Sequence, residues 1–116
     1  MPIKGEVWNV SLDPVQGHEQ AKTRPCIVIS NDQMNKKMGL SIVVPLSGSG
    51  YYIKSGKLSP IMVEIPAGEG GLNKNSYSLA FQVRAVSHLR FTQKLGVLSP
   101  TKLLAVVHSV QEIINF

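Results

Sequence analysis

The stretch between positions 13 and 24 concentrates the side chains of this sequence that are best suited to chemistry. Among its residues are Asp13, His18, Glu19, Gln20, Lys22 and Arg24, which supply carboxylates, a histidine, an amide and cations. The stretch has no helix or strand period, and it contains Pro14 and Gly17, which predicts a loop. Loops on a rigid scaffold commonly carry binding and catalytic groups, although a solvated loop without a function would have the same composition.

These side chains match what cleavage of an RNA phosphodiester requires. The 2′-hydroxyl of RNA is an internal nucleophile, so a protein must supply a base, an acid for the leaving 5′-oxygen and a cation for the charge on phosphorus. Glu19 can accept a proton, His18 titrates near neutral pH, and Arg24 presents a planar set of donors to phosphate oxygens. Ser47, in a Ser-Gly-Ser-Gly turn, can donate a hydrogen bond to a non-bridging oxygen. These four residues can act together only if the fold brings position 47 beside the loop.

Other common active-site patterns are missing from the sequence. It contains no Gly-x-Ser-x-Gly nucleophile elbow, no phosphate-binding loop and no dinucleotide fingerprint. A carboxylate pair for glycoside hydrolysis stays open, but no feature favours it. The single cysteine, Cys26, lies in the apolar run 26–29, so we expect a buried core side chain rather than a catalytic thiol or a zinc ligand.

The composition is that of a folded, basic protein. Hydrophobic residues make up 43% of the 116 residues and charged residues 16%, which argues against a disordered chain and suits one domain over residues 1–116. The net charge of +5 favours nucleic acid, an acidic protein or an anionic membrane surface as partner, without choosing among them. No apolar run approaches the roughly 20 residues that span a bilayer, and Lys4 and Glu6 interrupt the start, so we expect a cytoplasmic protein without a signal peptide or a membrane partner.

Short apolar segments predict that the fold is mainly β. Strand-like patterns occur at 6–12, 26–29, 42–44, 61–65 and 79–84. In the first of these, Trp8, Val10 and Leu12 share one face. The third is apolar on both sides, which predicts a central strand, with an edge or a bulge near its end at Pro45. Residues 33–38 fit a loop or one helical turn, and 87–96 fit weak helical turns.

The last part of the chain has the period of an α-helix. Ser99 can cap its N-terminus, and Pro100 suits its first turn. Apolar residues then recur at intervals of three and four: Leu103, Val106, Val107, Val110, Ile113 and Ile114. This stripe predicts a helix of about four turns that packs on the strands, with a partner-binding groove as the alternative. The whole pattern predicts a small β-barrel or curled sheet with a C-terminal helix.

Several motifs along the chain together resemble the MazF/PemK toxins. The resemblance begins with Gly5-Glu6-Val7-Trp8, Leu12-Asp13-Pro14, Gly17-His18-Glu19-Gln20 and Arg24-Pro25 before an apolar strand. It continues with Val44-Pro45-Leu46-Ser47, Gln82-Val83-Arg84 and Leu95-Gly96-Val97-Leu98-Ser99. The motifs cover nearly the whole chain, and the combined Gly-x-Glu-Gln and Arg-Pro spacing is fairly specific.

This resemblance implies an SH3-like barrel of the MazF/CcdB/PemK type that forms a homodimer. It also implies a sequence-specific mRNA interferase, which cuts single-stranded RNA without a metal ion or other cofactor and leaves 2′,3′-cyclic phosphate and 5′-hydroxyl ends. The second implied partner is a cognate antitoxin of a type II toxin-antitoxin system, whose acidic tail covers the RNA groove. Operator DNA would be bound only through the antitoxin complex.

The resemblance assigns catalysis to Arg24, Ser47 and Glu19. Arg24 matches the catalytic arginine of the family's Arg-Pro motif, and Ser47 stands where many members have a catalytic threonine. Glu19 matches an acidic residue that is implicated in some members.

Substrate contacts are expected from two parts of the chain: His18, Gln20 and Lys22 in the loop, and Gln82 and Arg84 in the later strand. Gln82 matches a glutamine that lines the family's groove. Phe81 departs from the family, in which an acidic residue often precedes that glutamine, so we expect a different groove surface and RNA preference.

Two other functions fit the same barrel. One is a non-enzymatic CcdB-like toxin that binds a protein target such as gyrase through a C-terminal hydrophobic tail containing tryptophan. The single tryptophan here, Trp8, lies in the first predicted strand instead. The other is a barrel that binds nucleic acid, with an affinity that falls as salt rises, and leaves it uncut.

Overall fold

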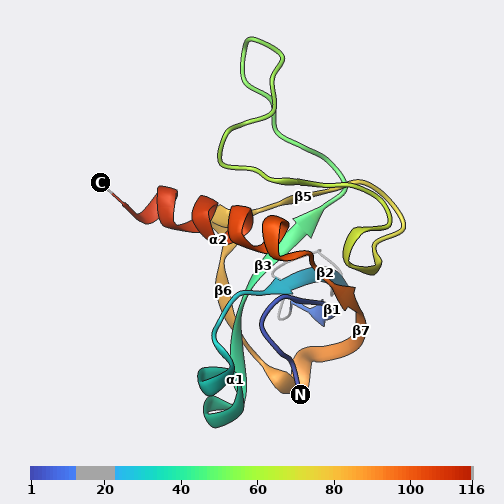
Figure 1. The fold of residues 1–116 in the computed structure, drawn as a ribbon, viewed down its shortest axis with the longest axis vertical. Coiled ribbons are helices and arrows are strands. Elements are labelled where there is room, and N and C mark those ends of the chain that lie inside the picture. The colour runs from blue at the N-terminus through green and yellow to red at the C-terminus, as the bar shows by residue number, and fades with distance from the viewer. Residues whose placement is uncertain (13–22, 116) are drawn as a thin grey trace, which may run out of the picture.

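The computed structural model describes residues 1–12 and 23–115, and its strands form one antiparallel sheet (Figure 1). The strands are β1 (Glu6–Ser11), β2 (Thr23–Val28), β3 (Leu40–Ser47), β4 (Glu64–Ile65), β5 (Ser76–Ser78), β6 (Arg84–Ser87) and β7 (Phe91–Val97). Two α-helices, α1 (Asp32–Met38) and α2 (Pro100–Ile114), and three 3-10 helices, η1 (Glu69–Gly71), η2 (Ala80–Gln82) and η3 (His88–Arg90), complete the described part.

The central strand of the sheet is β3, as its apolar sequence predicts. The order of strands is β4-β5-β3-β2-β1-β7, and β6 pairs with the first half of β3. The end of β3 pairs with β5, through Leu46 with Ser78 and Ser47 with Tyr77. The strand runs through Pro45, which pairs with Cys26 on β2 without a shift of register, so the expected edge or bulge is not found in this pair.

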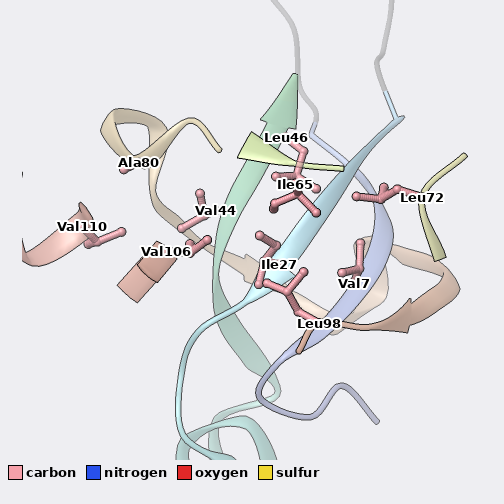
Figure 2. Close-up of a cluster of buried hydrophobic side chains, with 10 residues drawn as sticks. All are labelled: Val7, Ile27, Val44, Leu46, Ile65, Leu72, Ala80, Leu98, Val106 and Val110. Carbon is pink, nitrogen blue, oxygen red and sulfur yellow. The ribbon is translucent and has the colours of Figure 1, made fainter. Parts of the chain in front are cut away.

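The main core lies between the sheet and α2. Figure 2 shows the buried side chains that form it: Val7, Ile27, Val44, Leu46, Ile65, Leu72, Ala80, Leu98, Val106 and Val110. Val106 and Val110 belong to the predicted helical stripe, and Leu103 and Ile113 pack on the same cluster. This confirms that most of the stripe packs on the protein's own sheet, whereas Val107 lies outside the cluster and Ile114 is exposed.

A second cluster lies on the opposite face of the strands. Its buried members are Val10, Cys26, Val28, Val43 and Val86, and Trp8, Leu12 and Phe91 pack against it. Successive residues of a strand point to opposite faces, so the central strands contribute alternately to the two clusters. The predicted shared face of Trp8, Val10 and Leu12 is confirmed.

The helix α2 begins where the sequence predicts. The Ser99 hydroxyl accepts a hydrogen bond from the Lys102 N–H, and Pro100 occupies the first turn. The Ser99 N–H in turn donates to the Glu69 carboxylate at 2.7 Å, which lowers the pKa of Glu69. A polar contact from η1 thus adds to the cap of α2. No helix in the described ranges is long and apolar enough to cross a membrane.

A buried polar network attaches α1 to the sheet. The Asn35 side-chain oxygen accepts hydrogen bonds from the hydroxyls of Ser30 and Ser41, and its amide nitrogen donates to the Ser30 carbonyl oxygen. Because the Ser41 proton is used in this bond, the His88 Nε2–H donates to Ser41 at 2.8 Å. Of the two options left open for residues 33–38, the structure shows a helix, which begins after the Asn31 cap and ends before Gly39.

Two of the strand predictions are wrong in their extent. In the segment 61–65 only Glu64–Ile65 is a strand, because the Met62 N–H closes a turn onto the Ser59 carbonyl around Pro60. In the segment 79–84 the chain forms η2, and the next strand begins only at Arg84. The N–H groups of Gln82 and Val83 donate to the carbonyl oxygens of Leu79 and Ala80, so they close a turn instead of pairing with a neighbouring strand.

The expectation of weak helical turns over 87–96 is also mostly wrong. Only His88–Arg90 is helical, and Phe91–Val97 is a strand paired with β1. The register of that pair shifts between Val7 and Trp8 and again between Asn9 and Val10. These irregularities interrupt the alternation that marks a strand in sequence.

The turn η1 packs backbone to backbone against β7. A Cβ atom at Gly71 would lie 1.9 Å from the Leu95 carbonyl oxygen, and one at Gly96 would lie 2.6 Å from the Gly70 carbonyl carbon. Gly71 also has a φ of +75°. Glycine is therefore required at this contact both for space and for backbone conformation.

We expect Gly71→Ala to lower the free energy of unfolding by about 3 kcal/mol or more, because the added methyl group meets backbone that cannot move aside alone. Gly56→Ala is the matched control, since Gly56 has a φ of +85° but nothing within 4 Å of a Cβ atom. We expect the control to cost only about 1 kcal/mol, for the backbone conformation. Urea unfolding measures both, and equal losses would contradict the close contact.

Candidate active site

The pairing of β2 with β3 brings Arg24 and Ser47 together. Cys26 pairs with Pro45 in this ladder, and the same register continued by two residues places Arg24 opposite Ser47. Both residues line a cleft of about 250 Å³ at this end of the two strands. The other lining residues are Thr23, Pro25, Leu46, Gly48, Lys74 and Ser76.

The Ser47 hydroxyl is positioned by the turn that follows β3. Its Oγ accepts a hydrogen bond from the Ser49 N–H at 3.1 Å. This bond uses a lone pair of the oxygen and leaves the hydroxyl proton for another acceptor. Ser47 is half-buried. The preceding residue, Leu46, is buried in the main core and so fixes the backbone next to Ser47.

The cleft contains a cation that sequence reasoning missed. Lys74 lies in the connection before β5, and a Cβ atom at Gly48 would be 3.2 Å from its Nζ. The ammonium group therefore lies over the turn after Ser47, on the same cleft as Arg24. The one sequence signal was a lysine in a polar, glycine-containing loop, which does not distinguish it from other surface lysines.

Arg84 lies on the same face of the sheet as this pair. It pairs with Val43, which shares a face of β3 with Pro45 and Ser47. The charges of both Arg24 and Arg84 reach the buried thiol of Cys26. Burial raises the pKa of Cys26 to about 12, and the two arginines act against that shift. The thiol is thus a core group, as expected, and both arginines lie close enough for their charges to act on it.

Gln82 lies in η2, outside the residues that line the cleft. Its side chain is exposed, and its N–H donates to the Leu79 carbonyl. Leu79 in turn donates to the Pro45 carbonyl at 2.9 Å, two residues before Ser47. Gln82 and Arg84, the two substrate-contact candidates from the later strand, therefore lie beside β3, next to the cleft rather than in it.

The other site residues predicted from sequence, His18, Glu19, Gln20 and Lys22, lie outside the described residues. Thr23, the first described residue after them, lines the cleft. Among the side chains that the structure describes, no three His, Cys, Asp or Glu residues gather as a group of metal ligands.

This arrangement can bind a phosphodiester. A guanidinium, an ammonium and a hydroxyl donor converge on one small cleft, and each can bind a non-bridging oxygen. Charge-assisted hydrogen bonds of this kind stabilise the extra negative charge of a pentacoordinate phosphorus.

We expect the Cys26 thiol to resist alkylation in the folded protein. With a pKa of about 12, about one thiol in 10,000 is ionised at pH 8, against about a quarter in the unfolded chain. Iodoacetamide at pH 8 should therefore label the protein only when urea is present, as mass spectrometry can show. Rapid labelling without urea would contradict the burial of this group.

The comparisons with known proteins agree with this geometry. The profile of a family described as PemK-like, MazF-like toxin of type II toxin-antitoxin system matches residues 3–114. The chain is 36% identical over 110 residues to the endoribonuclease MazF of Staphylococcus saprophyticus, which covers 95% of this chain and 88% of that protein.

Solved structures share the fold at lower identity. MazF of Deinococcus radiodurans superposes with a TM-score of 0.78 at 24% identity, over 99% of this chain and 97% of that one. A mycobacterial endoribonuclease, solved in complex with its cognate antitoxin, gives a TM-score of 0.77 at 18% identity over 98% and 95% of the two chains. These likenesses confirm the predicted mainly β, SH3-like fold with a C-terminal helix.

Proposed function

Because this chain belongs to the family of PemK-like, MazF-like toxins of type II toxin-antitoxin systems, we propose that it is an endoribonuclease that cuts single-stranded RNA at specific sequences. The observation that carries the proposal is the cleft that Arg24 and Ser47 line together. The relative from S. saprophyticus, itself named an endoribonuclease, supports the same activity.

In the reaction we propose, the 2′-oxygen of the RNA attacks phosphorus while the bond from phosphorus to the 5′-oxygen breaks. The 2′-hydroxyl proton passes to a base, and the leaving oxygen takes up a proton, so the products are a 2′,3′-cyclic phosphate and a 5′-hydroxyl. Glu19 remains our candidate for the base, and His18 for a group that moves protons. Gln20, Lys22, Gln82 and Arg84 are proposed to bind the flanking RNA.

The described residues of the cleft have separate parts in this scheme. The Arg24 guanidinium binds the non-bridging oxygens and stabilises their extra charge in the transition state. The Ser47 hydroxyl already accepts a hydrogen bond from the Ser49 N–H, and it donates its own O–H to one of these oxygens. Lys74 adds a second positive charge at the rim. Together these groups supply the electrostatic stabilisation for which a metal ion would otherwise serve.

The same proposal includes the partners. We expect this chain to bind a cognate antitoxin. Two observations support this: the mycobacterial endoribonuclease was solved with its own antitoxin, and this chain is positively charged. We further propose that residues 1–116 act as one domain in a cytoplasmic homodimer, and that operator DNA is bound only together with the antitoxin.

The first test is incubation of the purified, antitoxin-free protein with a long single-stranded RNA in EDTA, followed by end-group mapping. We expect discrete cuts with 2′,3′-cyclic phosphate and 5′-hydroxyl ends. Arg24→Ala should lower the cleavage rate about 1,000-fold or more, because it removes the main charge on phosphorus. Ser47→Ala should lower it about 100-fold, while Ser47→Thr, which keeps the hydroxyl, should stay close to the wild-type rate.

Thermal unfolding should show that these variants remain folded, since neither side chain belongs to a core cluster. Intact RNA with a folded wild-type protein would reject the enzyme, and gyrase inhibition would then favour the CcdB-like alternative. Full activity in Arg24→Ala would reject the role of Arg24 alone.

Lys74 gives a separate prediction about substrate binding. We expect Lys74→Ala to weaken the binding of single-stranded RNA and to reduce the slope of log K against log salt by about 0.7, the value for one lost phosphate contact. Lys36→Ala is the control, because Lys36 is exposed on α1, which lies far from the end of β3 (Figure 1). An unchanged salt slope in Lys74→Ala, or the same change in Lys36→Ala, would remove Lys74 from the site.

A further inference from the structure

Two aromatic rings form an exposed stack near the cleft. The rings of Tyr51 and Phe81 have centroids 5.7 Å apart and an interplanar angle of 27°. Tyr51 comes from the long segment between β3 and β4, and Phe81 from η2. Their side chains are 54% and 43% exposed. The pair thus keeps apolar ring surface in contact with water instead of burying it in a core.

The chain around Tyr51 is well ordered by hydrogen bonds. The Tyr51 N–H donates to the sulfur of the buried Met62, and its carbonyl accepts from the Ser59 N–H at 2.7 Å. A bridge between Tyr52 and Leu58 then closes the tip of the segment. Tyr51 is therefore preorganised, so a ligand on its ring would not have to order the chain.

Phe81 is equally well supported. It is the middle residue of η2, in which the Val83 N–H donates to the Ala80 carbonyl. Ala80 is completely buried in the main core. The backbone of Phe81 is thereby tied to the core while its ring remains outside.

The stack lies within reach of an RNA strand bound in the cleft. Tyr51 follows Ser47 by four residues, so their Cα atoms are at most about 14 Å apart. Phe81 immediately precedes Gln82, and η2 is joined to β3 by the hydrogen bond from Leu79 to Pro45. Both rings are therefore tethered to the strand that ends in the cleft.

The charge of the segment that carries Tyr51 also suits a polyanion. The segment 48–63 contains no acidic residue, and its two lysines, Lys54 and Lys57, are exposed. The next acidic side chain along the chain, Glu64, accepts a hydrogen bond from the Tyr77 hydroxyl. Aromatic faces flanked by cations are the usual features of surfaces that bind single-stranded nucleic acid.

We propose that the Tyr51–Phe81 pair is a stacking platform for one unpaired base of the RNA, at a position that flanks the cut phosphate. The inference rests on the proposed function, because it takes the strand in the cleft to be RNA. The faces of a base are free only when it is unstacked, so the platform selects single-stranded substrate and helps to set the sequence preference.

Binding of an uncleavable RNA tests the platform. The probe is a single-stranded oligoribonucleotide that spans the mapped cut site with 2′-deoxy at the attacking nucleotide, or a mixed-sequence 20-mer if no cut is found. We expect Phe81→Ala and Tyr51→Ala each to raise Kd between about 5-fold and about 150-fold, the range for one lost base-aromatic stack. Phe81→Tyr should bind like the wild type because it keeps the ring, whereas Phe81→Leu should bind like Phe81→Ala.

An abasic series locates the stacked base when a cut site is known. Removing the base at one flanking position should weaken binding to the wild type, but should add nothing to the defect of Phe81→Ala, since both changes remove the same interaction. Leu89→Ala is the matched control, because Leu89 is a 95% exposed apolar residue in η3. It should leave Kd unchanged.

The outcomes separate this inference from the enzyme proposal. Normal binding by Phe81→Ala and Tyr51→Ala, with the wild type still cutting RNA, rejects the platform and leaves the enzyme. Binding without cleavage, weakened by the same variants, rejects the enzyme and supports the platform on a passive RNA-binding barrel. A wild-type protein that neither binds nor cuts RNA overturns both. Occupation of the pair by a protein partner rejects the platform alone.

Discussion

The antiparallel pairing of β2 with β3 is the constraint on which the core and the cleft both depend. Along this ladder Ile27 and Val44 face the main core, while Cys26 and Val28 face the second cluster. A fully buried valine or isoleucine stabilises a fold by about 1.5–3 kcal/mol, so the register is strongly determined by apolar burial. The polar pair at the end of the ladder, Arg24 and Ser47, is aligned by the same register without needing any attraction of its own.

Because apolar burial sets the register, positive charge can gather on one face of the sheet. The face toward α2 is closed by the helix, and the opposite face presents Arg24 and Arg84 above a thiol that burial keeps neutral. A neutral sulfur neither attracts nor compensates the guanidinium groups, so their charge remains available to an anion from outside. Lys74 reaches the same region from the chain before β5, which makes the cleft a meeting point of three separate segments.

Sequence reasoning succeeded where one physical period dominates. The stripe of α2, its Ser99 cap and the apolar β3 each follow a single pattern, and each was predicted correctly. It failed where tertiary contacts override the pattern: register shifts interrupt the pairing of β7 with β1, and the apolar alternation over 79–83 lies in the turn η2. For the site, the motif around Arg24 and Ser47 could be recognised, but Lys74 and the Tyr51–Phe81 stack depend on loop paths that no local period specifies.

The two connections that leave the central strands differ in how much they can change length. The one between β2 and β3 contains α1, whose Asn35 is bonded at once to Ser30 and Ser41. An insertion or deletion of one residue there would either break these bonds or shift the ladder, and a shift of one residue exchanges every inward side chain for an outward one. The segment 48–63 forms its hydrogen bonds mostly within itself, so its tip can lengthen without shifting the β2–β3 ladder. Extra residues in a surface loop add only slowly to its closing entropy. Relatives that diversify their targets by insertion should therefore do so after Ser47, and should leave the path from Val28 to Leu40 at constant length.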